Sequence, residues 1–308
     1  MEAFLAACVV AGTPLVLATV GELITEKSGS LNLGVEGMML MGAVMGFVAA
    51  YNTGNPVLAI LCAALAGAGG ALIFALVTVT LRANQTVTGL TLTIFGTGFA
   101  SFVGQPMIGF SVPNSVSTFF TKTSIPGLGN IPFLGPVLFK QDIFVYFAYV
   151  IVMVSCVYMY KTRLGLNMRA VGENAAAADA SGINVTLYKY AHIVMGGALC
   201  GLGGAYLSLI RVPIWQSDVV TGRGWIAVAL VIFASWNPVK ALVGAIFFGG
   251  LSILGLRLQA MGFTVSQYLV DMIPYVATVI IVIISSHKKK KENQPPADLG
   301  NNYFREER

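Results

Sequence analysis

The sequence predicts an all-α, polytopic membrane protein, and three observations predict it: the composition, the long apolar runs and the clustering of basic residues. Of the 308 residues, 56% are hydrophobic and only 10% are charged, whereas a soluble domain carries about 25% charged residues. The apolar residues fall into repeated runs, and a helix needs about 20 apolar residues to cross a bilayer. A transmembrane barrel would instead show short alternating segments, so the runs favour helices.

We expect about nine membrane spans (eight to ten). They cover residues 3–21, 34–51, 57–81, 88–108, 141–160, 190–210, 224–236, 239–256 and 268–286. The seventh is only about three and a half helical turns long, which suggests a broken or half-crossing helix. The chain is thus expected to form one transmembrane domain over residues 1–287, with a loop at 161–189 and a disordered basic and polar tail at 288–308.

Basic residues predict the orientation. The loop 161–189 and the start of the tail, "HKKKKENQPP" from His287, are both basic, and Lys and Arg favour the cytosolic side of a membrane. With nine spans, both regions lie in the cytosol only if the N-terminus lies outside. The Pro-containing segment 109–140 is then mostly loop on the outer side.

A weak internal repeat is visible. "GVEGMMLMGA" is followed by "NPVLAILCAALAGAGGAL" from Asn55, and "GRGWIAVALVIFASW" is followed by "NPVKALVGAIFFGGLSIL" from Asn237. In the predicted topology the second span runs outward and the seventh inward, so spans 1–4 and 6–9 would be inverted repeats. Such repeats are frequent in transporters, with substrate at their interface. Chance similarity among Gly/Ala-rich segments is the alternative.

The loop after the fifth span contains a short predicted helix. Asn174 is a suitable N-cap, residues 175–180 are strong helix formers and Gly182 is a suitable stop. A helix this short, rich in small residues and exposed to the cytosol, suits insertion into a cleft on another protein. An ordinary ordered loop is the alternative.

Enzymatic chemistry has no support in the sequence. No phosphate-binding glycine motif occurs, so we expect this chain not to hydrolyse ATP itself. No catalytic Ser/His/Asp set and no metal-binding His/Cys set stands at a suitable spacing. We therefore expect no catalytic residue, no metal and no cofactor in this chain.

Three segments carry a resemblance to a known family: "NLGVEGMMLMGA", "MRAVGENAAAADASGINV" and "GRGWIAVALVIFASWNP". They resemble permease subunits of bacterial ABC importers in the branched-chain amino acid and ribose permease superfamily, and above all its nucleoside (BmpA-associated) branch. The resemblance covers about residues 3–286. It implies a fold like that of type II (vitamin B12-type) importers and a place in the bacterial cell membrane.

The resemblance also implies partners. They are a second related permease, a tandem ATP-binding subunit that carries ATP and Mg, a substrate-binding lipoprotein, the bilayer and a nucleoside; no nucleic acid is implied. The segment from Gly172 to Gly182 would be the coupling helix that docks into the ATPase. The residues assigned to this contact are Arg169, Gly172, Glu173, Asn174, Ala178, Asp179 and Gly182.

Glu36 is the most conspicuous acid in an apolar run. The predicted topology puts it in the first turn of an outward-running helix near cytosolic water, where the helix dipole favours an acid and Lys27 could pair with it. We interpret it as an anchor or gate element, with substrate or proton binding as the alternative. The repeat places Arg223 in the matching position on the opposite side.

Other polar residues are candidates for the path and for partner docking. Donors and acceptors for a nucleoside, and an aromatic ring that could stack on its base, could line a path; helix–helix hydrogen bonding and interfacial anchoring are the alternatives. These path candidates are Asn32, Glu36, Asn84, Gln85, Thr86, Thr88 and Trp225. The candidates for docking of a binding protein at the outer mouth are Arg211, Asp218 and Arg223.

Two other function classes remain open. The substrate of such a permease could be a sugar or an amino acid, since selectivity resides largely in the external binding protein. An ion-coupled secondary carrier would need ionisable groups inside the membrane, and only Glu36 and Asp271 come near that requirement. A purely structural membrane protein would not account for the repeat or the cytosolic loop.

Overall fold

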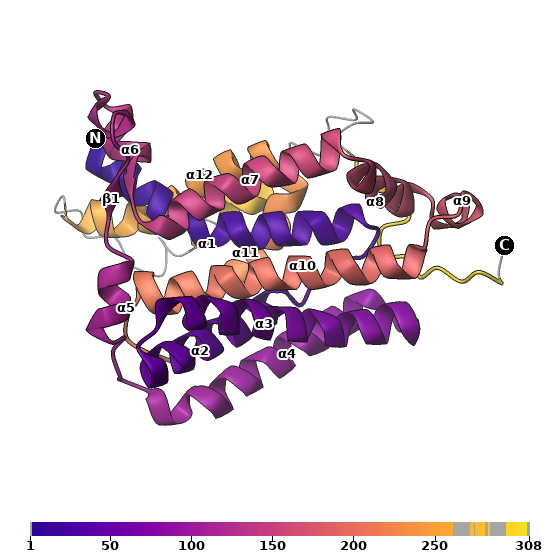
Figure 1. The fold of residues 1–308 in the computed structure, drawn as a ribbon, viewed down its shortest axis with the longest axis horizontal. Coiled ribbons are helices and arrows are strands. Elements are labelled where there is room, and N and C mark those ends of the chain that lie inside the picture. Colours follow the sequence, from indigo (N-terminus) through magenta and orange to yellow (C-terminus); the bar gives the residue numbers. More distant parts are fainter. Residues whose placement is uncertain (1, 261–271, 274, 281–282, 284–293, 307–308) are drawn as a thin grey trace.

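Long helices lie side by side along one axis of the molecule (Figure 1). The computed structural model describes residues 2–260, 272–273, 275–280, 283 and 294–306. Six helices of this part are long and apolar enough to cross a membrane. They are α1 (Glu2–Lys27), α2 (Val35–Thr53), α3 (Pro56–Ala75), α4 (Gln85–Gly104), α7 (Ile143–Lys161) and α10 (Val185–Tyr206).

Two shorter apolar helices follow, α11 (Arg223–Phe233) and α12 (Pro238–Ala260), and α3 and α10 are each extended by a π-helical turn, η1 (Leu76–Thr80) and η4 (Leu207–Arg211). The all-α polytopic fold is therefore confirmed. Eight of the expected spans correspond to these helices, with ends that differ by a few residues. About half of the ninth, 268–286, falls outside the described residues, so the total number of spans stays a prediction.

The two ends of the bundle differ (Figure 1). One end carries the N-terminus and small elements of the Pro-containing segment: η2 (Gln105–Met107), α5 (Asn114–Phe119), η3 (Leu128–Asn130), α6 (Leu134–Leu138) and the antiparallel strands β1 (Thr123–Ser124) and β2 (Lys140–Gln141). The other end carries α8 (Arg163–Glu173), α9 (Ala175–Ala180) and the C-terminal segment. We call the second the cytosolic end, because its basic residues predict that side.

Close backbone contacts hold the centre together. α2 and α10 are mostly buried, and α3 packs along both of them. A side chain at Gly42 would meet the backbone of Gly201 on α10, and Gly67 of α3 approaches the same residue. In lipid, where no hydrophobic force drives helices together, such contacts between small residues stabilise packing. The outer helix α4 instead exposes large apolar side chains, among them Phe102, which is 81% exposed.

The two Asn-Pro pairs of the predicted repeat begin equivalent helices. The side-chain oxygen of Asn55 accepts from the N–H groups of Val57 (2.9 Å) and Leu58 (3.3 Å) at the start of α3. The side chain of Asn237 accepts in the same way from two N–H groups at the start of α12, at 2.9 and 3.2 Å. In both helices Pro takes the first position, where its missing N–H costs nothing.

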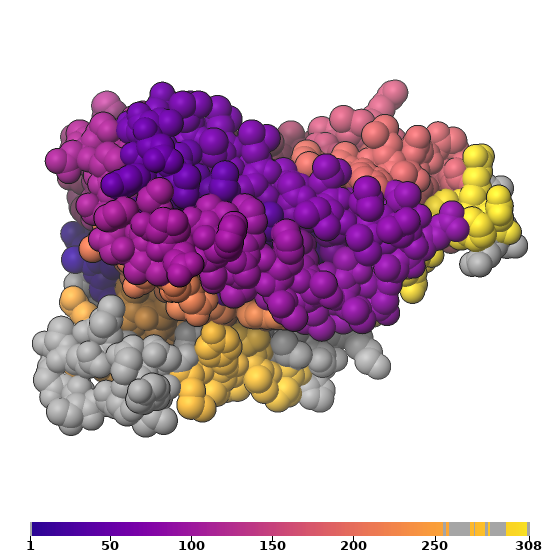
Figure 2. Space-filling view, turned by 90° about the horizontal axis from the view of Figure 1, so that it is seen from below, coloured from indigo at the N-terminus to yellow at the C-terminus, as the bar shows by residue number. Residues whose placement is uncertain are grey.

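The C-terminal segment differs from the disordered tail expected for residues 288–308. Residues 294–306 lie against the cytosolic end, next to the region where α3 meets α4 (Figure 2). The physical reason is that side chains such as Asp298 and Asn302 have specific backbone partners in the bundle. A polar composition indicates only that a segment cannot bury much apolar surface. Hydrogen bonds to the backbone of the bundle do not require buried apolar surface, so they can order a polar segment.

Candidate functional site

The segment between α1 and α2, residues 28–34, is folded into the bundle. Ser28, Ser30 and Asn32 are buried. The backbone N–H of Asn32 donates to Glu22 Oε1 (3.1 Å), so the segment turns back alongside α1. Because Glu22 lies five residues before the end of α1, this contact is about 7 Å inward from that end. The helix α2 therefore starts inside the bundle.

Glu36, in the first turn of α2, binds the start of another helix. Its Oε1 accepts from the backbone N–H of Gly222 (2.7 Å) and its Oε2 from that of Gly224 (2.6 Å). Gly222 is the N-cap residue of α11 and Gly224 lies in its first turn, and the N-cap glycine supplies no side-chain hydrogen bond. The unpaired N–H groups at a helix start carry partial positive charge, so the Glu36 carboxylate satisfies them from a distant part of the sequence.

The starts of α2 and α11 touch backbone to backbone. A Cβ atom on Gly224 would lie 2.5 Å from both Cα and N of Glu36, closer than any side chain tolerates. The α4 helix approaches from the other side, since a Cβ on Gly37 would lie 2.8 Å from Thr93 Cα. Glycine is thus required where these helices meet.

The two helices leave this contact in opposite directions. Beyond its end, α2 reaches the outer end of the bundle, where the Gly54 carbonyl accepts from Ser115 Oγ (2.9 Å). α11 leads toward the cytosolic end, where Trp236 Nε1 donates to Glu26 Oε2 (2.6 Å). The 11 residues of α11 span about 16 Å, roughly half of a hydrocarbon core of about 30 Å. The 19 residues of α2 span about 28 Å, so α2 is a full-length helix and only α11 is half-length. The two helices therefore meet inside the bundle, about 16 Å from its cytosolic end, and discontinuous helices of this kind border the substrate site in many transporters.

Three expectations about these residues need correction. Glu36 does begin an outward-running helix, but it is only 6% exposed rather than close to cytosolic water. Lys27 does not pair with it and instead lies over the ring of Trp236, 5.6 Å from the centroid. Arg223 is not on the opposite side, because it begins α11 next to Glu36. Hydropathy could not predict this, since it does not say how far a connecting segment folds inward.

Two buried acids were missed by the sequence analysis. Glu22 and Glu26 lie in the last two turns of α1 and are fully buried. Glu22 Oε2 has no hydrogen-bond partner in the part of the chain that the structure describes. The expected span ended at residue 21, so both acids were assigned to a loop. The spacing of four, with Leu23 and Ile24 between them, was the available signal, because it places both on one helix face.

The other path candidates fall into two groups. Asn32 and Trp225 lie near the meeting of α2 and α11. The Asn32 side chain accepts from Gly34 N (2.8 Å) and Trp225, in the first turn of α11, is 39% exposed. The remaining four lie at the cytosolic end, at the start of α4: Asn84, Gln85, Thr86 and Thr88.

Most of this second group is engaged by the protein itself. The Asn84 side chain accepts from Val87 N (3.0 Å) as the cap of α4, and the Thr88 hydroxyl donates to the Asn84 carbonyl (2.8 Å). Gln85 is buried, and its Oε1 accepts from Leu31 N (2.7 Å). These contacts stabilise the start of α4, whereas a role in the path stays a prediction.

The short helix predicted in the cytosolic loop is confirmed. It is α9, whose cap Asn174 accepts from Ala177 N (2.8 Å) and which ends before Gly182, a residue with φ of +83°. Of the proposed docking residues, Glu173, Asn174 and Gly182 are exposed. Gly172 and Ala178 are buried and hold the helix in place, while Arg169 and Asp179 are half-buried.

The outer candidates are not all at the same place. Arg211 ends η4 and Asp218 is exposed in the following segment. This segment pairs with the outer connection, because Trp215 N donates to the Phe110 carbonyl (2.9 Å). Arg223 is half-buried, and its guanidinium donates to the Val220 carbonyl (2.9 Å). Only Arg211 and Asp218 therefore lie toward the outer end.

One buried acid outside the spans has a shifted pKa. Asp142 precedes α7, where it accepts from Val145 N (3.1 Å) and from the Tyr206 hydroxyl (2.9 Å). Burial raises the pKa of Asp142, and these hydrogen bonds only partly oppose that rise. No group of three or more His, Cys, Asp and Glu residues that could hold a metal ion occurs among the residues searched, which are the described ones.

Known proteins resemble this chain over most of its length. The family model described as "Branched-chain amino acid transport system / permease component" matches residues 4–283. A putative glucose ABC transporter permease of Haloferax volcanii is 40% identical, over 83% of this chain and 77% of its own length. A guanosine ABC transporter permease of Bacillus subtilis is 35% identical, over 89% of each chain.

A nucleoside ABC transporter permease of Lactococcus lactis is 32% identical, over 91% of each chain. No solved structure matches this chain. The buried contact between α2 and the short, oppositely directed helix α11, the short helix on a basic loop and these matches lead to the same conclusion: the chain belongs to the family of permease components of branched-chain amino acid type ABC transport systems, and is an integral, multi-pass, non-enzymatic membrane subunit.

Proposed function

We propose that this chain forms half of the translocation path of an ATP-driven nucleoside importer in a bacterial cytoplasmic membrane. The observation that carries the proposal is the contact of Glu36 with Gly222 and Gly224, which joins the starts of α2 and α11. The half-length helix α11 begins inside the bundle against the start of α2, and a discontinuous helix of this kind provides a break in the hydrophobic barrier. Glu36 holds the starts of α2 and α11 together at this break, and a change in its contacts opens or closes the path.

The partners in this proposal are a second related permease, a tandem ATP-binding subunit and a substrate-binding lipoprotein. ATP and Mg bind the ATP-binding subunit, and this chain holds no cofactor. The exposed side of α9, with Glu173 and Gly182 at its ends, docks into that subunit. Closure of the ATPase on ATP moves α9, and coupling requires that this contact differ in free energy between the two access states. We further propose a fold of the type II (vitamin B12-type) importer class.

Nucleosides are the proposed substrates because two relatives that match over nearly their whole length are named for guanosine or nucleoside transport. The relative named for glucose transport, at 40% identity, makes a sugar the second candidate. Nucleosides and sugars share a hydroxylated ring, and nucleosides add a flat base that an aromatic side chain such as Trp225, 39% exposed, can stack against.

Competition for uptake tests the substrate. The importer, assembled with its ATP-binding and lipoprotein subunits in proteoliposomes, would take up radiolabelled guanosine. We expect an excess of unlabelled adenosine or inosine to suppress that uptake, and an excess of glucose, ribose or leucine to leave it unchanged. Suppression by glucose, or glucose uptake without guanosine uptake, would instead assign the chain to sugar transport.

An ion-coupled carrier is the competing function, and one observation favours it. Glu22, Glu26 and Glu36 are buried acids within apolar helices, and such groups often bind coupling ions in secondary carriers. All three have assigned partners: Glu22 accepts from Asn32 N, Glu26 from Trp236 and Glu36 from the start of α11. Because the family consists of ABC permeases, ATP remains the proposed energy source.

A further inference from the structure

The C-terminal segment, residues 294–306, crosses the cytosolic end of the bundle and touches helices that are far apart in the sequence. We call these residues the strap. On one side the strap binds α9, and on the other it binds the turn between η1 and α4. Between the two it passes the loop 28–34, where Gly300 N donates to the Gly29 carbonyl (3.3 Å).

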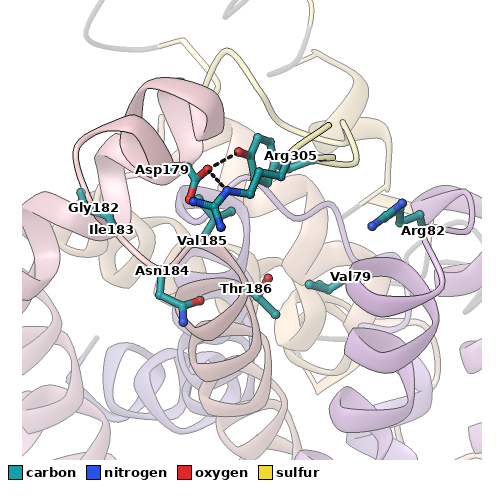
Figure 3. A pocket seen from close by; sticks show the side chains of 10 residues that line it. Val79, Arg82, Asp179, Gly182, Ile183, Asn184, Val185, Thr186 and Arg305 are labelled. Atoms are coloured by element: carbon teal, nitrogen blue, oxygen red, sulfur yellow. Dashed lines mark hydrogen bonds and ion pairs between the residues drawn. The ribbon is translucent and has the colours of Figure 1, made fainter. Parts of the chain in front are cut away.

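At the α9 side the strap holds both ends of the short helix. Asp298 Oδ2 accepts from Ala175 N (2.7 Å), the first residue of α9. Near its other end, Asp179 accepts from the Tyr303 hydroxyl (2.8 Å) and forms an ion pair with Arg305 (3.2 Å). Figure 3 shows the contacts of Asp179 at the rim of a pocket of about 400 Å³ that Arg82 also lines. A six-residue helix is too short to be stable alone, so these contacts hold it.

At the α4 side the strap holds a strained turn. Arg82 has φ of +57°, in the left-handed region that non-glycine residues rarely adopt. Asn302 Nδ2 donates to the carbonyls of Arg82 (2.7 Å) and Ala83 (3.0 Å), and the Arg82 guanidinium lies 3.7 Å from the centre of the Phe304 ring. Such strain persists only where the surroundings fix it, and here the strap fixes it.

Gln85 links the strap to the interior. Its Nε2 donates to Asn302 Oδ1 (3.1 Å), while its Oε1 accepts from Leu31 N (2.7 Å). Leu31 is next to Asn32, whose side chain accepts from Gly34 N, and Gly34 comes directly before α2 and two residues before Glu36. A continuous set of hydrogen bonds and a few covalent links therefore join α9 to the contact between α2 and α11.

We propose that Asp298 and Asn302 are positioning residues of the transport cycle, because they tie α9 to the start of α4 and to the loop that leads to Glu36. A displacement of α9 by the ATPase is then passed through the strap to the contact between α2 and α11. This proposal rests on the proposed function for its role in transport, whereas the mechanical link itself can be measured without transport.

Hydrogen exchange of the purified full-length chain in nanodiscs tests the link. Asn302→Ala removes contacts only on the α4 side. We expect it to speed amide exchange about fivefold in residues 174–182, which Asn302 does not touch, as well as in residues 29–33. Asn301→Ala is the matched control, because this exposed neighbour contributes its backbone carbonyl to Gln85 and Lys189, and we expect it to leave exchange unchanged. Asn302→Asp keeps the acceptor oxygen for Gln85 but loses both hydrogen bonds that Asn302 donates. This variant replaces Asn302→Ala in the experiment if the alanine variant folds poorly.

The assembled importer tests the consequence. We expect Asn302→Ala and Asp298→Ala to retain assembly and basal ATP hydrolysis but to transport several-fold less guanosine per ATP hydrolysed, and Asp298→Asn, which keeps an acceptor oxygen, to lose less. Faster exchange confined to residues 80–88, or equal effects of the 301 and 302 variants, overturns the link. If exchange changes as expected but wild-type uptake proves independent of ATP, the link stands and the proposed function fails.

Discussion

Glu36 and Gly224 join the two halves of the predicted repeat: the Gly224 N–H donates to Glu36 Oε2 at 2.6 Å, and the Gly224 Cα leaves no room for a side chain beside the Glu36 backbone. Glu36 supplies the hydrogen-bond acceptor. Gly224 supplies the donor, and its lack of a side chain leaves room for the Glu36 backbone. The start of α11 and the start of α2 are therefore a single structural unit, although they are about 190 residues apart in sequence.

Replacement of Glu36 by Gln should destabilise the protein. The Gln amide keeps one acceptor oxygen but turns an NH₂ group toward a backbone N–H, so one donor of α11 is left buried without a partner. Loss of a charged hydrogen bond at such a site costs about 1.5–3 kcal/mol. We expect a clearly lower melting temperature in thermal unfolding of the purified protein. Glu173→Gln, at an exposed position, is the control. Equal melting temperatures for both variants would show that Glu36 does not stabilise the contact between α2 and α11.

Gly224→Ala should destabilise the protein about as much as Glu36→Gln does, through steric overlap. The added methyl group would overlap the Glu36 backbone, and overpacking of this kind costs about 1–3 kcal/mol. Gly98→Ala on α4 is the matched control, because nothing lies within 4 Å of a Cβ at that position. We expect lower stability and slower transport only for the variant at 224. A well-folded, fully active Gly224→Ala protein would mean that the two helices are farther apart than described.

The two Asn-Pro caps should contribute equally. Asn55→Ala and Asn237→Ala each remove a side chain that accepts from two N–H groups at a helix start, and loss of such a cap costs about 1 kcal/mol. Thermal unfolding of each single variant and of the double variant measures this, with the exposed Asn130→Ala as control. A large loss at one site and none at the other would contradict the equivalence of the two helix starts.

Stability should depend on pH through Asp142. Because burial raises its pKa in the folded protein, the folded state binds this proton more tightly than the unfolded state. The resulting stabilisation is complete below the ordinary pKa, near 4, and is lost as the pH rises through the raised value. The stability of wild type relative to Asp142→Asn should thus fall with rising pH, by at most about 1.4 kcal/mol per pH unit.

Melting temperatures of both proteins between pH 4 and 8 measure this difference, with Asp218→Asn, at an exposed position, measured in parallel. A difference that stays constant, or that grows with pH, would contradict the effect of burial on Asp142.

Local features of the sequence predicted local structure well. Hydropathy located the apolar helices, and Asn174 and Gly182 predicted both ends of α9, because caps act within a few residues. The partner of Glu36 could not be predicted, since the contact depends on how the segments before α2 and α11 fold inward. The order of the strap was also missed, because it comes from side chains such as Asn302 that bind the backbone of distant residues.

ATP dependence tests the central claim most directly. The importer would be assembled from this chain, its second permease, the ATP-binding subunit and the lipoprotein in proteoliposomes, and guanosine uptake measured with and without internal ATP. We expect uptake only with ATP, no effect of collapsing proton and sodium gradients, and uncoupling of ATP hydrolysis from uptake by Gly182→Pro, which should distort the end of α9. Uptake that persists without the ATP-binding subunit and follows an ion gradient would contradict the account.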